Sequence, residues 1–599
     1  MKERTNVSAR RPQRRYIYGM LLTLLLSGLM MGPACDRAKP DSNNKTGQTT
    51  NATSNTATAQ TSQTQTGGLA KMEKVEIKDV GPAAPSVIMI GGMKGYIEPC
   101  GCTLDVTAGG IDRIVEFVEV VSGFAPAHAT VAAGNIWFER PSLDESEIAQ
   151  ATIKAEGIAK VFKHLGITAV TPGPNDFARG VDEYKRLNDL AGVKPHGLNI
   201  KIAGEALPGS VTMDLDGVKT GLVFGVEEEL FEELDGVEVE PLAPKLAAEV
   251  KRLEGEGVDA IVLVYQGKLA GSKKLLEANP RIDFVLVGEE PRETDQVDAV
   301  EGGGHTLEVF DQGRYVGVLK LYDPEGGASD EDYSNARTGS KAEIEAVEAQ
   351  IEHVNKSINK MPPAAPGEEP PMLVTLRERL RSLQARKKEI ENSAVKLPEG
   401  KRAFIWRAVR LDEAYPEDDA FTKVLSGLNA EIDKVNRSTE FELIPPKEGE
   451  PFYVGNAQCK SCHAEAYAFW KTTNHSHALE TLQKTNKDFN QDCIGCHVVG
   501  YNKPGGSVLG KLSYKAMLDG KLEIEKDLAD VGCENCHGPG SKHVEAAMFG
   551  KHGKPGNFIK NLGINEQTCM ASCHVPEHSP RFNYDVYRAQ ILGKGHGGK

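Results

Sequence analysis

The chain has 599 residues and a formal net charge of −15, with 40% hydrophobic and 26% charged residues. This length exceeds what one hydrophobic core supports, so two or more domains are expected. The acidic excess lies between residues 36 and 450 and argues against nucleic acid as a partner.

The N-terminus has the features of an export signal. Arg10, Arg11, Arg14 and Arg15 precede the apolar run GMLLTLLLSGLMM, which is too short to span a bilayer but suits a signal-peptide core. Ala34 before Cys35 resembles a lipoprotein processing site, although Gly32 stands where that pattern has an aliphatic residue. We therefore expect residues 1–35 to be a signal peptide with lipidation at Cys35, and a plain secretory signal is the alternative. The body of the chain would then lie on the periplasmic side of a Gram-negative membrane, held by its lipid.

Residues 36–70 are rich in Ser, Thr, Asn and Gln, a composition that predicts a disordered tether. Between residues 71 and 328, apolar runs such as SVIMIGG and AIVLVYQG alternate with helical patterns such as GIDRIVEFVEVV. This alternation predicts a layered α/β domain. MDLDGVKTGLVF and LEVFDQGRYVGVLKLYD predict two β-hairpins within it.

Residues 340–395 have the spacing of a coiled coil. Isoleucine and valine recur every three or four residues from Ile344 to Ile358, and after the break MPPAAPGEEPP a similar register continues from Leu373. The pattern predicts an antiparallel helical hairpin that is a spacer, a dimerisation arm or a solvated hairpin. Residues 396–450 predict a further strand and helix that lead into a last domain, 451–599.

Four cysteine–histidine motifs crowd that last domain. Two cysteines followed directly by a histidine are typical of c-type haem attachment, in which the thiols bond to the porphyrin and the histidine ligates iron. The fourth motif has one extra residue between its cysteines. The predicted attachment residues are Cys459, Cys462, Cys493, Cys496, Cys533, Cys536, Cys569 and Cys573, and the proximal ligands are His463, His497, His537 and His574.

Three other interpretations of the cysteine pairs explain less. Zinc knuckles and disulfides do not require a histidine after each pair, and redox thiol pairs normally occur singly. Ten of the 15 histidines follow residue 460, which leaves six beyond the proximal four and favours bis-histidine haems. We expect His552 to be a surface residue; the other candidates are His475, His477, His543, His578 and His596.

The domain resembles the cytochrome c-554-like tetrahaem family over residues 452–599. The resemblance is carried by YVGNAQCKSCHAEAYAFWKTTNHSHALETL, CIGCHVVGYNKPGG, GCENCHGPGSKH and CHVPEHSPRFNYDVY. It implies a mostly helical domain with about four closely stacked haems, and it implies that one haem can be five-coordinate. By motif position it implies distal ligands at His475, His543 and His578, with His596 as a weaker fourth and His477 as an alternate. We expect His543 to reach a neighbouring haem.

The α/β domain resembles the metallophosphoesterase half of 5'-nucleotidases, but the residues that hold the two metal ions there are missing. We therefore do not expect phosphatase activity. The positions of the missing ligands carry Gly92, Met93 and Lys94, then Gly134 and Asn135, then Pro174, Asn175 and Asp176, then Gln266, and last Gly288, Glu289, Glu290 and Pro291.

Cys100 and Cys102 stand near the mouth of this emptied site, followed by Gly109, Gly110 and Arg113. A Cys-x-Cys pair can bind a soft metal, form a disulfide or accept a sulfur substrate. A plain disulfide or an inert pair is an equal alternative.

The sequence thus predicts a lipid-anchored, multihaem electron-transfer protein whose partners are redox proteins. One rival is a haem enzyme that acts on a small nitrogen or sulfur compound at an open iron. Another is a sulfur- or metal-binding module at Cys100 and Cys102 that is connected to the haems.

Overall fold

The computed structural model describes most of the chain from residue 83 onward. The described ranges are 83–100, 107–231, 234–289, 296–322, 331–332, 402–413, 415–551, 564–571, 573–575 and 582–593, with residues 292 and 579 and scattered positions between 347 and 387. The predicted signal and tether lie outside these ranges, as do Cys35, Cys102, His552, His578 and His596, and only the backbone of Cys100 is described. The chain divides into Met1–Ala70 and Lys71–Lys599, and all described elements lie in the second unit.

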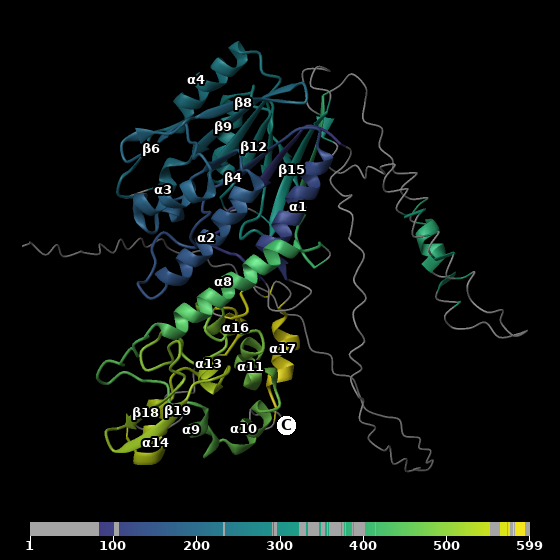
Figure 1. Ribbon diagram of the computed structural model, residues 1–599. Helices are drawn as coiled ribbons and strands as arrows, with labels where there is room; N and C mark the ends of the chain where they lie inside the picture. The colour runs from purple at the N-terminus through teal and green to yellow at the C-terminus, as the bar shows by residue number, and fades with distance from the viewer. Residues whose placement is uncertain are drawn as a thin grey trace, which may run out of the picture. The chain divides into compact units, whose positions relative to one another are not determined.

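Two six-stranded sheets pack face to face at the centre of the α/β part (Figure 1). The first sheet, in order, consists of β16 (Glu331–Asp332), β17 (Ala403–Arg410), β15 (Tyr315–Tyr322), β1 (Ser86–Ile90), β4 (His128–Ala133) and β5 (Ala169–Thr171). The second consists of β13 (Val297–Ala299), β14 (His305–Glu308), β12 (Phe284–Val287), β11 (Ala260–Gln266), β9 (Val218–Val226) and β8 (Ser210–Leu215).

Helices cover the outer face of each sheet. Helices α1 (Ile111–Phe124), α2 (Ile148–Leu165) and α8 (Asp419–Ser438) pack on the first sheet, and α4 (Leu242–Gly255) and α5 (Leu269–Ala278) pack on the second. The resulting order, helix–sheet–sheet–helix, confirms the predicted layered α/β domain. The remaining elements here are β2 (Pro99–Cys100), β3 (Ala108–Gly109), η1 (Pro174–Phe177), α3 (Gly180–Ala191), β6 (Ile200–Ile202), β7 (Glu205–Ala206), η2 (Glu228–Phe231) and β10 (Val237–Val239).

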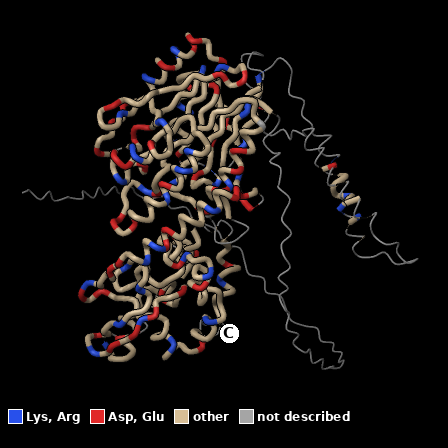
Figure 2. Tube along the Cα trace, in the orientation of Figure 1, with Lys and Arg blue, Asp and Glu red and all other residues tan. Residues whose placement is uncertain are grey.

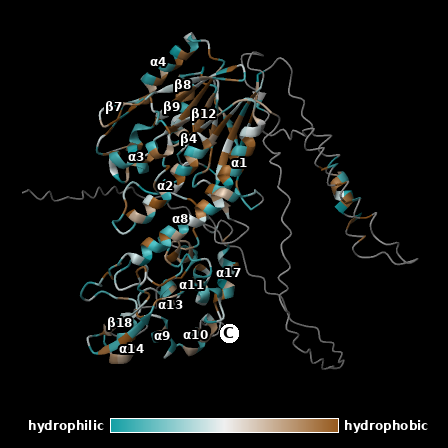
Figure 3. Ribbon diagram, in the orientation of Figure 1, coloured by the Kyte–Doolittle hydropathy of each residue, from teal (hydrophilic) through white to brown (hydrophobic). Residues whose placement is uncertain are grey.

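The central strands are apolar because both of their faces are covered. In β1, Val87 and Met89 face the second sheet, whereas Ile88 and Ile90 face the helices. Figure 2 shows few charged residues along these strands, and Figure 3 shows them as hydrophobic. An uninterrupted apolar run therefore predicts a strand that is buried on both faces here.

One predicted hairpin is confirmed and the other is wrong. Strands β8 and β9 pair antiparallel around Asp216 and Gly217, as expected. Strands β14 and β15 belong to different sheets, because β14 pairs with β12 and β13 whereas β15 pairs with β1 and β17, so the loop between them crosses from one sheet to the other. Strand periodicity alone does not distinguish a hairpin from such a crossing.

The loops that follow β4 and β5 touch through glycines. A Cβ on Gly134 would collide with the backbone of Gly173, and a Cβ on Gly173 would collide with Asn135. Only glycine permits this approach, which brings together the loops that hold the metal ligands in phosphoesterases.

The segment predicted to connect the domains contributes β17 to the first sheet and helix α8 to its cover. The side chain of Asp418 caps α8 by accepting hydrogen bonds from the N–H groups of Ala420 and Phe421. Within 340–395, Val347, Val354 and Leu383 form a small buried cluster. The hairpin itself stays a prediction, since most of that segment lies outside the described residues.

The C-terminal region is built from short helices and one hairpin around small apolar clusters. This confirms the predicted helical character. None of the helices within the described residues is long and apolar enough to cross a membrane. The elements are α9 (Asn456–Lys460), α10 (Ala464–Trp470), η3 (Asn474–His477), α11 (Ala478–Gln483), α12 (Gln491–Ile494), β18 (Ser513–Leu518), β19 (Leu522–Asp527), α13 (Cys533–His537), α14 (Ser541–Phe549), α16 (Glu566–Met570) and α17 (Tyr584–Ile591).

Candidate functional site

Each cysteine motif begins on a short helix, namely α9, α12, α13 or α16. Residues three apart on a helix share a face, so the helical turn aligns the two thiols. In the first motif the N–H of His463 donates to the carbonyl oxygen of Cys459 at 2.9 Å. In the fourth the N–H of His574 donates to the carbonyl oxygen of Cys569 at 3.0 Å. The hydrogen bond in the fourth motif thus closes a turn that is one residue longer, which accommodates the extra residue between its cysteines.

The motif thiols lie close together in two pairs. A hydrogen bond between Cys459 and Cys533 raises the pKa of the Cys459 thiol and lowers that of Cys533. A hydrogen bond from Cys573 lowers the pKa of Cys496 to about 7. The eight described motif cysteines form no disulfide with one another. The first motif therefore neighbours the third, and the second neighbours the fourth.

Two pairs of imidazoles face one another across these motifs. The ring centres of His463 and His543 are 6.0 Å apart, and those of His475 and His574 are 6.4 Å apart. An iron bound at about 2 Å from one nitrogen of each of two imidazoles holds the ring centres roughly 6 Å apart. Both pairs therefore have a spacing that fits a bis-imidazole iron.

His497, in the second motif, has a different environment. Its Nδ1 atom lies 2.6 Å from the carbonyl oxygen of Ala478, a contact that orients the ring and leaves Nε2 for a metal. Among the described residues no imidazole faces it. The side chain of His477 is 58% exposed and lies 3.6 Å from Glu480, so the structure brings His475 rather than His477 into the imidazole pairs.

Glu534, between the two cysteines of the third motif, is a buried positioning residue that no sequence pattern singles out. It is 3% exposed, and its carboxylate accepts hydrogen bonds from the N–H groups of Val454, Gly455 and Gly540 at 2.6–3.1 Å. Burial raises its pKa, and the backbone donors oppose that effect. Glu534 thus joins the third motif to the start of the first and to the turn that precedes His543.

A buried polar network attaches the second motif to the α/β part. Lys154 of α2 is 6% exposed, and its Nζ atom lies 2.6 Å from Asp492, directly before Cys493. The side-chain amide of Gln150 donates to Asn490 at 3.0 Å and accepts from Asn436 of α8 at 2.7 Å. These partners are more than 50 residues apart in the chain, so no local pattern could have predicted the network.

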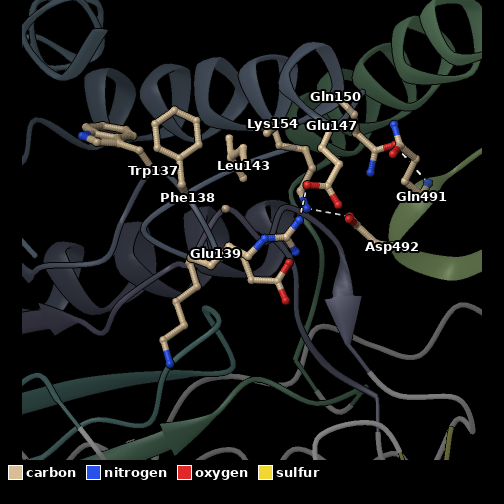
Figure 4. Close-up of a pocket in the computed structure, with 13 residues that line it drawn as sticks. Trp137, Phe138, Glu139, Leu143, Glu147, Gln150, Lys154, Gln491 and Asp492 are labelled. Carbon is tan, nitrogen blue, oxygen red and sulfur yellow. Dashed lines mark hydrogen bonds and ion pairs between the residues drawn. The ribbon is translucent and has the colours of Figure 1, made fainter. Parts of the chain in front are cut away.

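A cavity of about 230 Å³ opens beside this network (Figure 4). One wall comes from α2 and from the loop after β4, and the other comes from Gln491 and Asp492. Four of its charged groups form ion pairs: Lys154 pairs with Asp492, and Arg140 pairs with Glu147. The cavity therefore lies between the emptied phosphoesterase site and the second motif.

Hydrogen bonds connect side chains at the positions where the sequence resemblance places the missing metal ligands. Asn135 and Gln266 both donate to one carboxylate oxygen of Glu289, at 2.9 and 2.6 Å. Asp176 accepts from the N–H groups of Ile136 and Trp137, and burial raises its pKa to about 6. Within the described ranges no group of three or more His, Cys, Asp or Glu side chains is arranged to hold a metal ion.

Comparison with known proteins agrees with this division of the chain. Residues 458–538 match the family "Cytochrome c554 and c-prime". Cytochrome c-554 of Nitrosomonas europaea is 36% identical over 126 residues, which are 18% of this chain and 46% of that protein. Over these residues the C-terminal region is thus similar to cytochrome c554. The chain spans slightly less than half the length of this curated relative.

Solved structures also resemble the chain. The 5'-nucleotidase precursor from Thermus thermophilus is 12% identical with a TM-score of 0.40, over 75% of this chain and 72% of that one. A 5'-nucleotidase from Staphylococcus aureus is likewise 12% identical with a TM-score of 0.40, over 74% and 70%.

We expect Glu534→Gln to destabilise the haem-loaded protein by about 1–3 kcal/mol. The substitution replaces one carboxylate oxygen with an NH2 group, which cannot accept hydrogen bonds from the backbone N–H groups and leaves buried donors unpaired. Unfolding in guanidinium chloride measures this change. Glu525→Gln is the matched control, since Glu525 is exposed on β19 and its replacement should change the stability by less than about 0.5 kcal/mol. Equal stability of the two variants would refute the positioning role of Glu534.

Proposed function

We propose that the chain is a membrane-tethered, periplasm-facing cytochrome that transfers electrons through about four covalently bound c-type haems. The two imidazole pairs with centres 6.0 and 6.4 Å apart are the observation that carries this proposal. The cytochrome c554 match supports it. Each bound haem supplies one-electron chemistry, and lipidated Cys35 holds the chain at the membrane.

The residues of the chain have separate roles in this proposal. The eight motif cysteines form thioether bonds, and the four motif histidines are proximal ligands. His543 completes the site of His463, and His475 completes that of His574. Two fixed imidazoles on one iron favour electron transfer without exchange of ligands. Acidic and basic residues are interspersed along the described part of this region (Figure 2).

The first test counts haems on the intact exported protein, by pyridine haemochrome absorbance and by mass. About four per chain are expected, and fewer than three would overturn the proposal. In a redox titration, His543→Met should raise the potential of one haem, because methionine as axial ligand raises haem potentials. His477→Met is the matched control; the His477 side chain is exposed, and all potentials should stay unchanged.

A second candidate function is reduction or oxidation of a small nitrogen or sulfur compound at an open haem. It is favoured by His497, which no described imidazole faces, and by the cavity beside Asp492. Electron paramagnetic resonance of the oxidised protein separates the two functions. A high-spin ferric signal that shifts with nitrite, hydroxylamine or sulfite supports the enzyme, whereas purely low-spin signals exclude it.

A third candidate is a sulfur- or metal-binding module at Cys100 and Cys102. Its support is Glu98, two residues before Cys100, which lies 2.7 Å from Lys487 near the second motif. Cys100→Ser should then abolish binding of Zn²⁺ or of a persulfide to the haem-loaded protein and leave its haem potentials unchanged. Unaltered binding would refute this module.

A further inference from the structure

Arg314, in the loop between β14 and β15, is a buried cation that forms no ion pair with any residue that the structure describes. It is 2% exposed, and its Nε and Nη2 atoms are buried without a hydrogen bond to any described residue. Arg402, by contrast, is also largely buried but lies 3.0 Å from Asp283.

An unpaired buried guanidinium is unfavourable, since desolvation of a charge is offset only by a partner of opposite charge. The nearest acid in the loop, Asp311, contacts Lys94 instead. The ring of Phe310 lies 5.6 Å from the guanidinium carbon, but a cation–π contact replaces only part of the lost hydration. The remaining requirement is for an anion.

Arg314 lies at the edge of the first sheet where β1 ends. The N–H of Gln312 in the same loop donates to the carbonyl oxygen of Gly92 at 2.7 Å. This is the carboxyl edge of the parallel strands, where ligands of α/β domains bind. The loop is thus placed to meet a ligand at the site that lost its metal-binding residues.

A second arginine lies near the backbone of Arg314. A Cβ on Gly109 would lie 3.3 Å from the Cα atom of Arg314, and Nη1 of Arg113 donates to the carbonyl oxygen of Gly109 at 3.3 Å. Arg113 pairs with Glu417 through Nη2, but its Nε is buried without a partner among the described residues. Gly109 thus contacts the backbone of Arg314 and accepts a hydrogen bond from Arg113, a second arginine with an unused donor.

We propose that Arg314, assisted by Arg113, binds a small oxyanion at this edge of the α/β domain. A carboxylate, a phosphate or a sulfur oxyanion matches the planar donor fork of a guanidinium. The domain would then be a receptor for an anionic metabolite rather than a hydrolase. This site requires none of the haem assignments, so it and the proposed electron transfer can fail independently.

Thermal unfolding of the intact haem-loaded protein tests the site. The melting temperature is compared in chloride, acetate, phosphate, sulfate and sulfite at constant ionic strength, and calorimetry measures the binding of each stabilising anion. For the natural protein we expect saturable stabilisation by at least one oxyanion. Arg314→Met should abolish that stabilisation, and in chloride it should melt at the same temperature or higher, because an unpaired buried charge has been removed.

Arg402→Met is the matched control. It removes a buried arginine that has a partner, so it should lower the melting temperature and keep the oxyanion response. An equal oxyanion response in Arg314→Met would reflect the general effect of excluded salts and would overturn the proposal. Destabilisation of Arg314→Met in chloride, with no oxyanion response in the natural protein, would also overturn it, because the chain itself would then neutralise Arg314.

Discussion

An ion pair between Lys154, which is buried, and Asp492, which is partly exposed, joins the α/β domain to the second motif. Lys154 belongs to α2, and Asp492 directly precedes the first cysteine of the second motif. A buried ammonium that loses its carboxylate partner costs several kcal/mol, so this pairing strongly restrains α2 and the second motif. Gln150 and Asn436 add hydrogen bonds that neither part could satisfy alone. The α/β domain therefore contributes directly to holding the second motif in place.

Hydrogen bonds also hold together the ends of three strands next to this attachment. The side chains of Asn135, Gln266 and Glu289 connect the ends of β4, β11 and β12. The loop after β4, fixed in this way, continues into α2 and forms one wall of the cavity beside Asp492. These hydrogen bonds therefore help to position that wall of the cavity.

Local features of this protein could be predicted from sequence, and long-range ones could not. The four motifs and the two-sided strands such as β1 depend on spacing within a few residues, and the structure forms them where expected. The pairing of His463 with His543 joins residues 80 positions apart, and no spacing rule encodes it. The crossing of β14 to β15 failed as a hairpin for the same reason. Glu534 and Arg314 have no distinguishing neighbours in sequence, since their roles depend on burial and on partners elsewhere in the chain.

The packing of the C-terminal region provides a separate argument for the proposed haems. Helices α10, α16 and α17 contain no buried residue, and Val586 and Tyr587 of α17 are exposed apolar side chains. Helices this short are not stable in water without an apolar face packed against a core. Protein side chains supply only small clusters here. Porphyrins attached at the paired thiols would add large apolar faces next to these helices, so the same groups that carry electrons would complete the core.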